Sequence, residues 1–207
     1  MLTYKGIKLN WLGHASFKIE NEITIYIDPF HIKKEDTADL ILITHEHYDH
    51  CSPEDMDKVS GKETIIIAPP SCDPSIGRDF RKVKVGDRVE VKGVVIDVVP
   101  AYNVGKKFHP KEKGGVGYIL TMNRIHIYHA GDTDIIKEMG KIRADIALLP
   151  VGGTYTMNAE EAAQAAEMIK PKIAIPMHYG SIIGSGEDAE EFKKKCTVCK
   201  VEILGKE

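Results

Sequence analysis

Cysteine and tryptophan are scarce in this sequence, and long apolar runs are missing. The 207 residues include four cysteines and one tryptophan. So few cysteines in a chain of this length exclude the dense disulfide framework of small secreted domains. No stretch approaches the roughly 18 apolar residues that a membrane-spanning helix needs. Residues 1–11 alternate polar and apolar side chains, without the apolar run of a signal peptide. We therefore expect a cytoplasmic protein with no membrane partner.

The sequence also has no large excess of positive or negative charge. The formal net charge is −3, with 29% charged and 43% hydrophobic residues. This composition is ordinary for a globular protein and gives no general attraction for nucleic acid. A small anionic substrate would therefore have to be attracted by a local group of charges. The length fits a single domain spanning residues 1–207, and the sequence leaves a homo-oligomer open.

Short strands and a few helices are predicted along the whole chain. One helix should begin at Pro53 with Ser52 as its cap, and a second after Asn158, where Glu161 completes a capping box. A third, charged helix is expected at residues 187–195. This pattern predicts an α/β or α+β class and favours a four-layer αββα order. The expected strands are residues 7–12, 16–20, 22–27, 40–43, 64–67, 89–91, 94–98, 116–121, 124–128, 145–148, 172–175 and 198–204.

The densest group of potential metal ligands lies in residues 44–50, THEHYDH. This segment follows the apolar strand 40–43. His45 and His47 are two residues apart, so in an extended segment their side chains point to the same side. Asp49 and His50 follow as the chain turns and can face the same cavity. An exposed polar loop is the alternative, but four potential ligands within six residues favour a metal site. Imidazole and carboxylate together suit zinc, manganese or iron better than calcium.

Three further candidate ligands share one placement in the chain. Asp28, Asp132 and His178 each follow a predicted strand. Any one of them alone is ordinary turn chemistry. Together with the 44–50 segment, they put acids and histidines at the carboxyl ends of four strands, the edge where α/β sheets bind ligands.

The ordered ligands Asp28, His45-x-His47-x-Asp49-His50, Asp132 and His178 resemble the metallo-β-lactamase superfamily, and most closely its UlaG-like and UPF0173-type metal-dependent hydrolases. Residues 11–15 (WLGHA), 128–133 (YHAGDT) and 176–179 (PMHY) are typical of that branch. The resemblance covers nearly the whole chain. It implies a four-layer αββα sandwich of the metallo-β-lactamase type. It also implies one or two divalent ions as cofactor, with Zn, Mn or Ni as candidates.

The resemblance implies a role for each ligand. One ion would be held by His45 and His47, and the other by Asp49, His50 and His178, with Asp132 bridging the two. Asp28 would fix the tautomer and orientation of a ligand histidine. In catalysis, Asp49 would also orient the attacking hydroxide, and either His14 or His109 would donate a proton to the leaving group.

One departure from the family pattern lies after the strand 94–98. Asn103 stands where many members have a further histidine for the first ion, and His109 follows six residues later. Either His109 completes that site or a single ion is held tightly; we favour His109 as ligand. The nearby segment 106–113 is locally basic. It is either a solvated face or a rim that guides an anionic substrate, with Lys106 as the candidate contact.

The expected activity is hydrolysis by a metal-activated hydroxide. A phosphodiester or other small anionic ester is the favoured substrate, and nucleic acid is expected only in that small form. A lactonase acting on a sugar-phosphate lactone or similar carboxylic ester is the alternative. A non-catalytic metal-binding or redox protein on the same scaffold is the rival from another class. Cys196-x-x-Cys199 has the spacing of half a zinc site, but a structural pair is favoured because no second half is visible.

Overall fold

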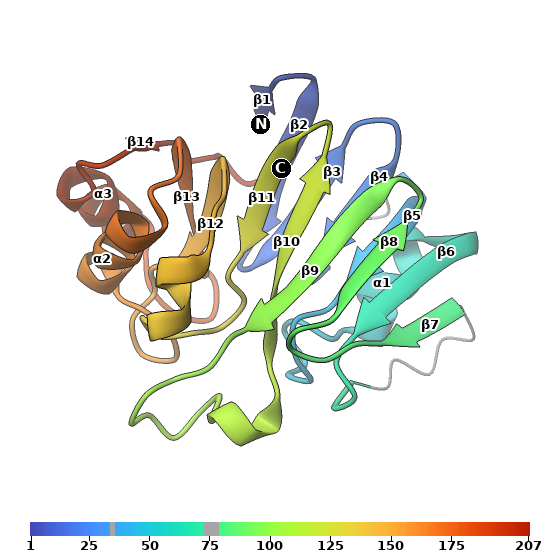
Figure 1. Cartoon of the computed structure of the whole chain (residues 1–207), viewed down its shortest axis with the longest axis horizontal. Coiled ribbons are helices and arrows are strands. Elements are labelled where there is room, and N and C mark those ends of the chain that lie inside the picture. Colours follow the sequence, from blue (N-terminus) through green and yellow to red (C-terminus); the bar gives the residue numbers. More distant parts are fainter. Residues whose placement is uncertain (34–35, 73–78) are drawn as a thin grey trace. The chain divides into compact units, whose positions relative to one another are not determined.

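The computed structural model describes residues 1–33, 36–72 and 79–207. The chain divides into two compact units, Met1–Lys84 with Leu204–Glu207, and Val85–Ile203. Each unit contains one seven-stranded sheet (Figure 1). This confirms the predicted α/β class, whereas the single-domain organisation stays a prediction. No helix in the described part of the chain is long and apolar enough to cross a membrane.

The N-terminal unit builds its sheet in simple sequence order. Its first three strand pairings are antiparallel and its last three are parallel. Met56 and Val59 of the helix Pro53–Val59 pack into a buried cluster with Tyr26, Ile41 and Ile66, which lie on three neighbouring strands. The elements are β1 (Leu2–Tyr4), β2 (Ile7–Gly13), β3 (Ser16–Glu20), β4 (Thr24–Ile27), β5 (Ala38–Leu42), α1 (Pro53–Val59), β6 (Ser60–Ala68) and β7 (Asp79–Lys82).

The C-terminal unit repeats this construction. Its sheet also starts with three antiparallel pairings and ends with three parallel ones. Helix α2 packs against α3 and β12, and α3 packs against β13 (Figure 1). The elements are β8 (Arg88–Val91), β9 (Val94–Pro100), η1 (Lys111–Lys113), β10 (Val116–Met122), β11 (Ile125–His129), η2 (Lys137–Lys141), β12 (Ile146–Pro150), α2 (Ala159–Ile169), β13 (Ile173–Met177), α3 (Gly186–Lys195) and β14 (Lys200–Val201).

The repeated strand order gives two aspartates equivalent positions. In each unit the fourth strand is the last antiparallel one and begins the parallel part of the sheet. Asp28 directly follows the fourth strand of the first unit, and Asp132 closely follows that of the second. This is the point in a sheet where strand direction changes and where ligand sites commonly form. The topology therefore explains why both aspartates are candidates for the functional site.

Most expected elements occur within a few residues of their predicted bounds, but the edge strands do not. Neither β1 nor β7 was expected, and β14 is much shorter than the predicted strand 198–204. The segment Asp79–Lys82 carries three charged residues and is largely exposed, so it has no apolar alternation. Its strand conformation comes from parallel pairing with β6. Pairing with a neighbour is a tertiary effect that local pattern does not reveal.

The capping box at α2 gives a first prediction about stability. The Asn158 side chain accepts a hydrogen bond from the Glu161 N–H at 2.9 Å, and the Glu161 carboxylate accepts one from the Asn158 N–H at 2.9 Å. We expect Asn158→Ala to lower the free energy of unfolding by about 1 kcal/mol. In a domain of this size, that corresponds to roughly 2–4 °C in thermal unfolding. Gln164→Ala, at an exposed position in the same helix, is the control and should leave the midpoint unchanged.

Candidate metal centre

Asp28 organises the ligand segment of the N-terminal unit. Its fully buried carboxylate accepts hydrogen bonds from the Thr44 N–H at 2.8 Å and the Thr44 hydroxyl at 2.6 Å. His50 Nδ1 lies 2.8 Å from the same carboxylate. A buried carboxylate requires such partners, because an uncompensated charge is costly to bury. Asp28 therefore fixes the start of the 44–50 segment from beneath.

These contacts determine which ring nitrogen of each histidine is left for a ligand. Since an ionised Asp28 only accepts, His50 Nδ1 must donate to it, and a neutral ring then carries its lone pair on Nε2. The Thr44 hydroxyl uses its proton on Asp28, so it accepts from His45 Nδ1 at 3.0 Å. His45 therefore also presents Nε2 as a lone-pair donor. These are the tautomers that metal binding requires, and Thr44 is a residue that sequence reasoning missed.

The geometry of His45 and His47 fits a bound cation. His45 Nε2 lies 3.1 Å from His47 Nδ1. Two nitrogens on one tetrahedral zinc, each 2.0–2.1 Å from it, are about 3.3 Å apart. At this distance the lone pairs of the two nitrogens would repel each other unless a proton or a metal ion lay between them. The donor set therefore fits a divalent ion, and the assignment of these residues as ligands stays a prediction.

His14, Asp49 and His50 form a second cluster in the same unit. One ligand atom from each lies within 4.8 Å of the others. His14 Nε2 is 3.0 Å from Asp49 Oδ2, and the His14 ring centroid is 5.3 Å from that of His50. The Trp11 indole N–H donates to the His14 carbonyl at 2.9 Å and holds the turn in place. The structure thus brings both predicted catalytic residues together with a predicted ligand.

The C-terminal unit gathers its own candidate ligands around Asp132. His178 Nε2 lies 3.1 Å and His109 Nε2 lies 3.4 Å from the same carboxylate oxygen, Asp132 Oδ2. Asp132 and His178 are almost fully buried. A Cβ on Gly152 would come within 2.3 Å of the His178 carbonyl oxygen, so the His178 loop requires glycine there. Asp132 is therefore suited to share a cation with one or both imidazoles.

Asn103 and His109 have different positions relative to Asp132. The Asn103 amide donates to the Phe108 carbonyl at 2.9 Å and the Tyr155 carbonyl at 2.7 Å. His109 Nδ1 lies 3.2 Å from the Tyr155 carbonyl, which can only accept, so Nδ1 carries a proton and Nε2 faces Asp132. Asn103 therefore closes the loop, and His109 is the better candidate ligand of the two.

Lys106 is held within the protein. Its ammonium forms an ion pair with Asp134 and donates to the Thr156 carbonyl at 2.7 Å. A second carbonyl, that of Gly153, lies 3.3 Å away. These contacts disfavour the predicted contact of Lys106 with substrate, which stays untested. The Lys106–Asp134 pair instead anchors the basic segment 106–113.

Backbone conformation marks several candidate residues independently of their side chains. Ten non-glycine residues in the described part of the chain have positive φ, a region that L-residues rarely occupy. Half of them lie in turns or a helix cap remote from the candidate ligands. The other five are His14 (φ 52°), Asp28 (46°), His31 (49°), His109 (55°) and His178 (58°). Strained backbone clusters at functional sites, so this signal supports four of the predicted site residues.

The four cysteines are free thiols. Cys196 and Cys199 have their sulfurs 3.5 Å apart at the end of α3. The Cys199 S–H and nearby backbone N–H groups lower the pKa of the Cys196 thiol to about 7, against the effect of its burial. In the described residues, no other histidine, cysteine or acid joins this pair in a group that could hold a metal ion. The hypothesis that Cys196 and Cys199 form half of a zinc site therefore gains no support.

Comparison with known proteins gives a consistent result. The Beta-lactamase superfamily domain matches residues 8–178. The chain is 39% identical to a UPF0173 metal-dependent hydrolase of Pyrococcus abyssi, covering 91% of each chain. It is 34% identical to one of Methanopyrus kandleri, covering 96% of this chain and 93% of the relative.

Solved structures agree with these sequence relatives. Igni18, a metallo hydrolase from Ignicoccus hospitalis, superposes with a TM-score of 0.80 at 28% identity, covering 96% of this chain and 94% of its own. An isothiocyanate hydrolase from Delia radicum gut bacteria, at 18% identity and a TM-score of 0.74, shares the fold, covering 96% of each chain. The predicted fold and family are thereby confirmed. The chain belongs to the UPF0173 metal-dependent hydrolases of the metallo-β-lactamase superfamily.

Proposed function

We propose that this hydrolase cleaves a phosphodiester in a small anionic substrate, using two divalent ions. The observation that carries the proposal is the number of donors. The N-terminal unit alone orients four of them, one more than the three protein ligands that a catalytic zinc ion takes. These donors are His45, His47, Asp49 and His50. Paired metal ions are typical of phosphatases and nucleases, where they stabilise both the attacking and the leaving oxygen.

A bound metal ion would supply Lewis acidity and would lower the pKa of water to roughly 7, so that hydroxide is available near neutral pH. The protein's own groups then position and move protons. Asp28 and Thr44 keep the Nε2 atoms of His45 and His50 unprotonated. Asp49 orients the attacking oxygen. His14 holds a proton at Nε2 against Asp49 Oδ2, 3.0 Å away, from which it can pass to the leaving oxygen.

Hydrolysis of bis-p-nitrophenyl phosphate tests this function. Metal-stripped protein is reconstituted separately with Zn²⁺, Mn²⁺ and Ni²⁺, and the release of nitrophenolate is measured. We expect metal-dependent turnover that is lost in His47→Ala and retained in His126→Ala, which removes an exposed histidine of β11. Metal content is measured for every variant.

Two outcomes would replace the proposal. If two ions bind and the diester is not cleaved, lactones and other carboxylic esters become the substrates to test, because a lactonase is the alternative activity that the sequence suggests. If metal binds and no ester in either class is cleaved, the non-catalytic metal-binding role gains support.

A further inference from the structure

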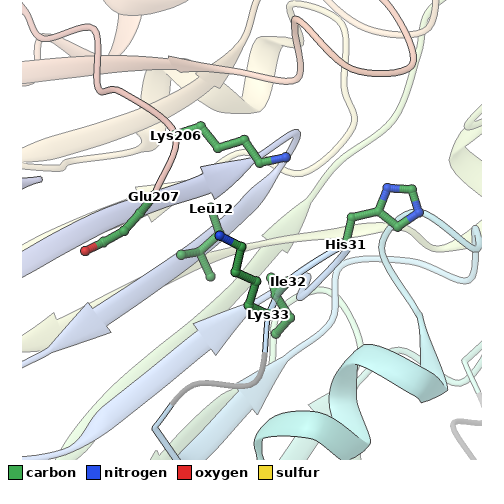
Figure 2. Close-up of a pocket in the computed structure, with 6 residues that line it drawn as sticks. All are labelled: Leu12, His31, Ile32, Lys33, Lys206 and Glu207. Atoms are coloured by element: carbon green, nitrogen blue, oxygen red, sulfur yellow. The ribbon is translucent and has the colours of Figure 1, made fainter.

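A cationic pocket lies in the N-terminal unit, beside the end of β2. It has a volume of about 340 Å³ and is lined by Leu12, His31, Ile32, Lys33, Lys206 and Glu207 (Figure 2). Leu12 and Ile32 are buried and form its apolar part. The lining brings together two segments remote in sequence, residues 31–33 and 206–207. Neither lysine belongs to the candidate metal centre.

Lys206 is held in place by the strand beneath it. A Cβ on Gly13 would lie 2.9 Å from Lys206 Cε and 3.1 Å from Lys206 Nζ. The lysine stem therefore occupies the space that glycine leaves open, and Gly13 itself has a φ of +105°. The Glu207 N–H donates to the Trp11 carbonyl at 3.1 Å and ties this segment to β2. The position of the ammonium is thus more restricted than that of an ordinary surface lysine.

The other side of the pocket is fixed through Asp55 on α1. Its carboxylate accepts from the backbone N–H groups of His31 at 3.0 Å and Ile32 at 3.2 Å. Burial favours a higher pKa for Asp55, but hydrogen bonds from Lys58, Ser52 and the His31 N–H hold that pKa below its usual value. An ionised Asp55 therefore anchors the segment that leads directly into Lys33.

Within the described residues, the ammonium groups of Lys33 and Lys206 have no carboxylate partner. Among residues 1–33, 36–72 and 79–207, no ion pair or side-chain hydrogen bond involves Lys33 or Lys206. Glu207 is the acidic residue in the lining, and its side chain leaves the backbone in a different direction from that of Lys206 (Figure 2). The pocket is therefore locally positive in a chain of net charge −3. Two ammonium groups suit an anion with more than one negative charge.

The pocket lies close to the proposed catalytic residue His14. Leu12 lines it, Gly13 lies under Lys206, and the next residue, His14, contacts Asp49 at 3.0 Å. Adding Cα spacings of 3.8 Å to side-chain lengths places Lys206 Nζ within roughly 13 Å of His14 Nε2. A group bound at the lysines can therefore belong to the same small molecule whose ester is cleaved.

We propose that Lys33 and Lys206 form a phosphate-binding subsite, which holds a terminal phosphate group of the substrate away from the bond that is cleaved. The inference rests on the proposed function and narrows it. The substrate class becomes short phosphodiesters that carry a terminal phosphate.

Binding of inorganic phosphate tests the subsite without turnover. Equilibrium dialysis is performed on metal-loaded protein and on metal-stripped protein, where no metal competes for the anion. We expect one saturable site in stripped protein, weakened at least about tenfold in Lys33→Gln/Lys206→Gln. Lys62→Gln, an exposed lysine of the same unit, should bind like the unchanged protein. Absence of a saturable site, equal binding by the double variant, or displacement of phosphate by equimolar acetate would overturn the proposal.

Kinetics separate the failure of this inference from the failure of the proposed function. With a p-nitrophenyl diester that carries a terminal phosphate, the double variant should raise KM about tenfold and change kcat less than about twofold. With bis-p-nitrophenyl phosphate, which lacks that group, both constants should stay unchanged. An equal rise in KM for the two substrates would contradict a terminal-phosphate site. If neither diester is cleaved, the proposed function fails, and the dialysis result alone decides on the subsite.

Discussion

Asp132→Asn should abolish metal-dependent turnover while leaving the fold intact. The substitution keeps the size of the side chain and removes only its negative charge. In the native chain, one oxygen of Asp132 faces His178 Nε2 at 3.1 Å and His109 Nε2 at 3.4 Å. A neutral amide is a far weaker ligand for a divalent ion, and its N–H₂ end cannot bind metal at all. Loss of an outer hydrogen-bond partner already costs 10–100-fold, so loss of this carboxylate should cost more than about 100-fold in kcat/KM.

The measurement combines metal content, thermal unfolding and hydrolysis. Metal per chain should fall in Asp132→Asn, and the unfolding midpoint of metal-stripped protein should stay close to that of the unchanged chain. Asp97→Asn is the matched control. Asp97, on β9, forms an ion pair with the exposed Arg88 of β8 and is not a candidate ligand. Full activity with undiminished metal content in Asp132→Asn would remove Asp132 from the ligand set.

Local sequence patterns predict where the candidate ligands lie along the chain better than they predict the contacts between them. The 44–50 segment follows β5, and Asp28, Asp132 and His178 follow β4, β11 and β13, as their strand-end placement suggests. The start of α2 and its capping box are also as predicted, because both depend on residues within one helical turn. These features are encoded by near neighbours along the chain.

Features that depend on contacts between residues far apart in the sequence cannot be predicted from local sequence patterns. Thr44 precedes the first histidine of the segment and its residue type gives no signal, yet its contacts with Asp28 and His45 set the tautomer of His45. Lys106 sits in a basic stretch, and only its pairing with Asp134 shows that its charge is used internally. The edge strands β1 and β7 likewise depend on their pairing partners.

The repeated strand order of the two units is also invisible as a sequence repeat. Both sheets pass from antiparallel to parallel after their fourth strand. The residues that follow this strand, Asp28 and Asp132, nevertheless have different surroundings. Asp28 is saturated by donors from its own unit, whereas Asp132 faces two imidazoles. Equivalent topology thus supplies one aspartate that supports ligands and one that is suited to be a ligand.

Asp28→Asn should weaken metal binding without touching a proposed ligand. In the unsubstituted protein, the Asp28 carboxylate accepts a hydrogen bond from the Thr44 N–H at 2.8 Å and lies 2.8 Å from His50 Nδ1. If the Asn oxygen keeps the Thr44 N–H bond, its amide N–H₂ faces His50 Nδ1. A donor in that place stabilises the tautomer protonated on Nε2, which cannot bind a metal, as when an asparagine replaces the buried aspartate of a catalytic triad. We expect metal affinity to fall about 10–100-fold.

Competition with a chelating dye measures this affinity, and nitrogen NMR of labelled histidine reads the tautomer of His50 directly. Thr44→Val is the companion variant, because it removes the hydroxyl that accepts from His45 Nδ1 at 3.0 Å and leaves the Asp28 carboxylate in place. It should lower affinity by less than Asp28→Asn does, since His50 keeps its partner. The two losses together would show that the carboxylate acts by fixing proton positions. An unchanged affinity in Asp28→Asn, with His50 still protonated on Nδ1, would show instead that the ligand geometry is held by packing alone.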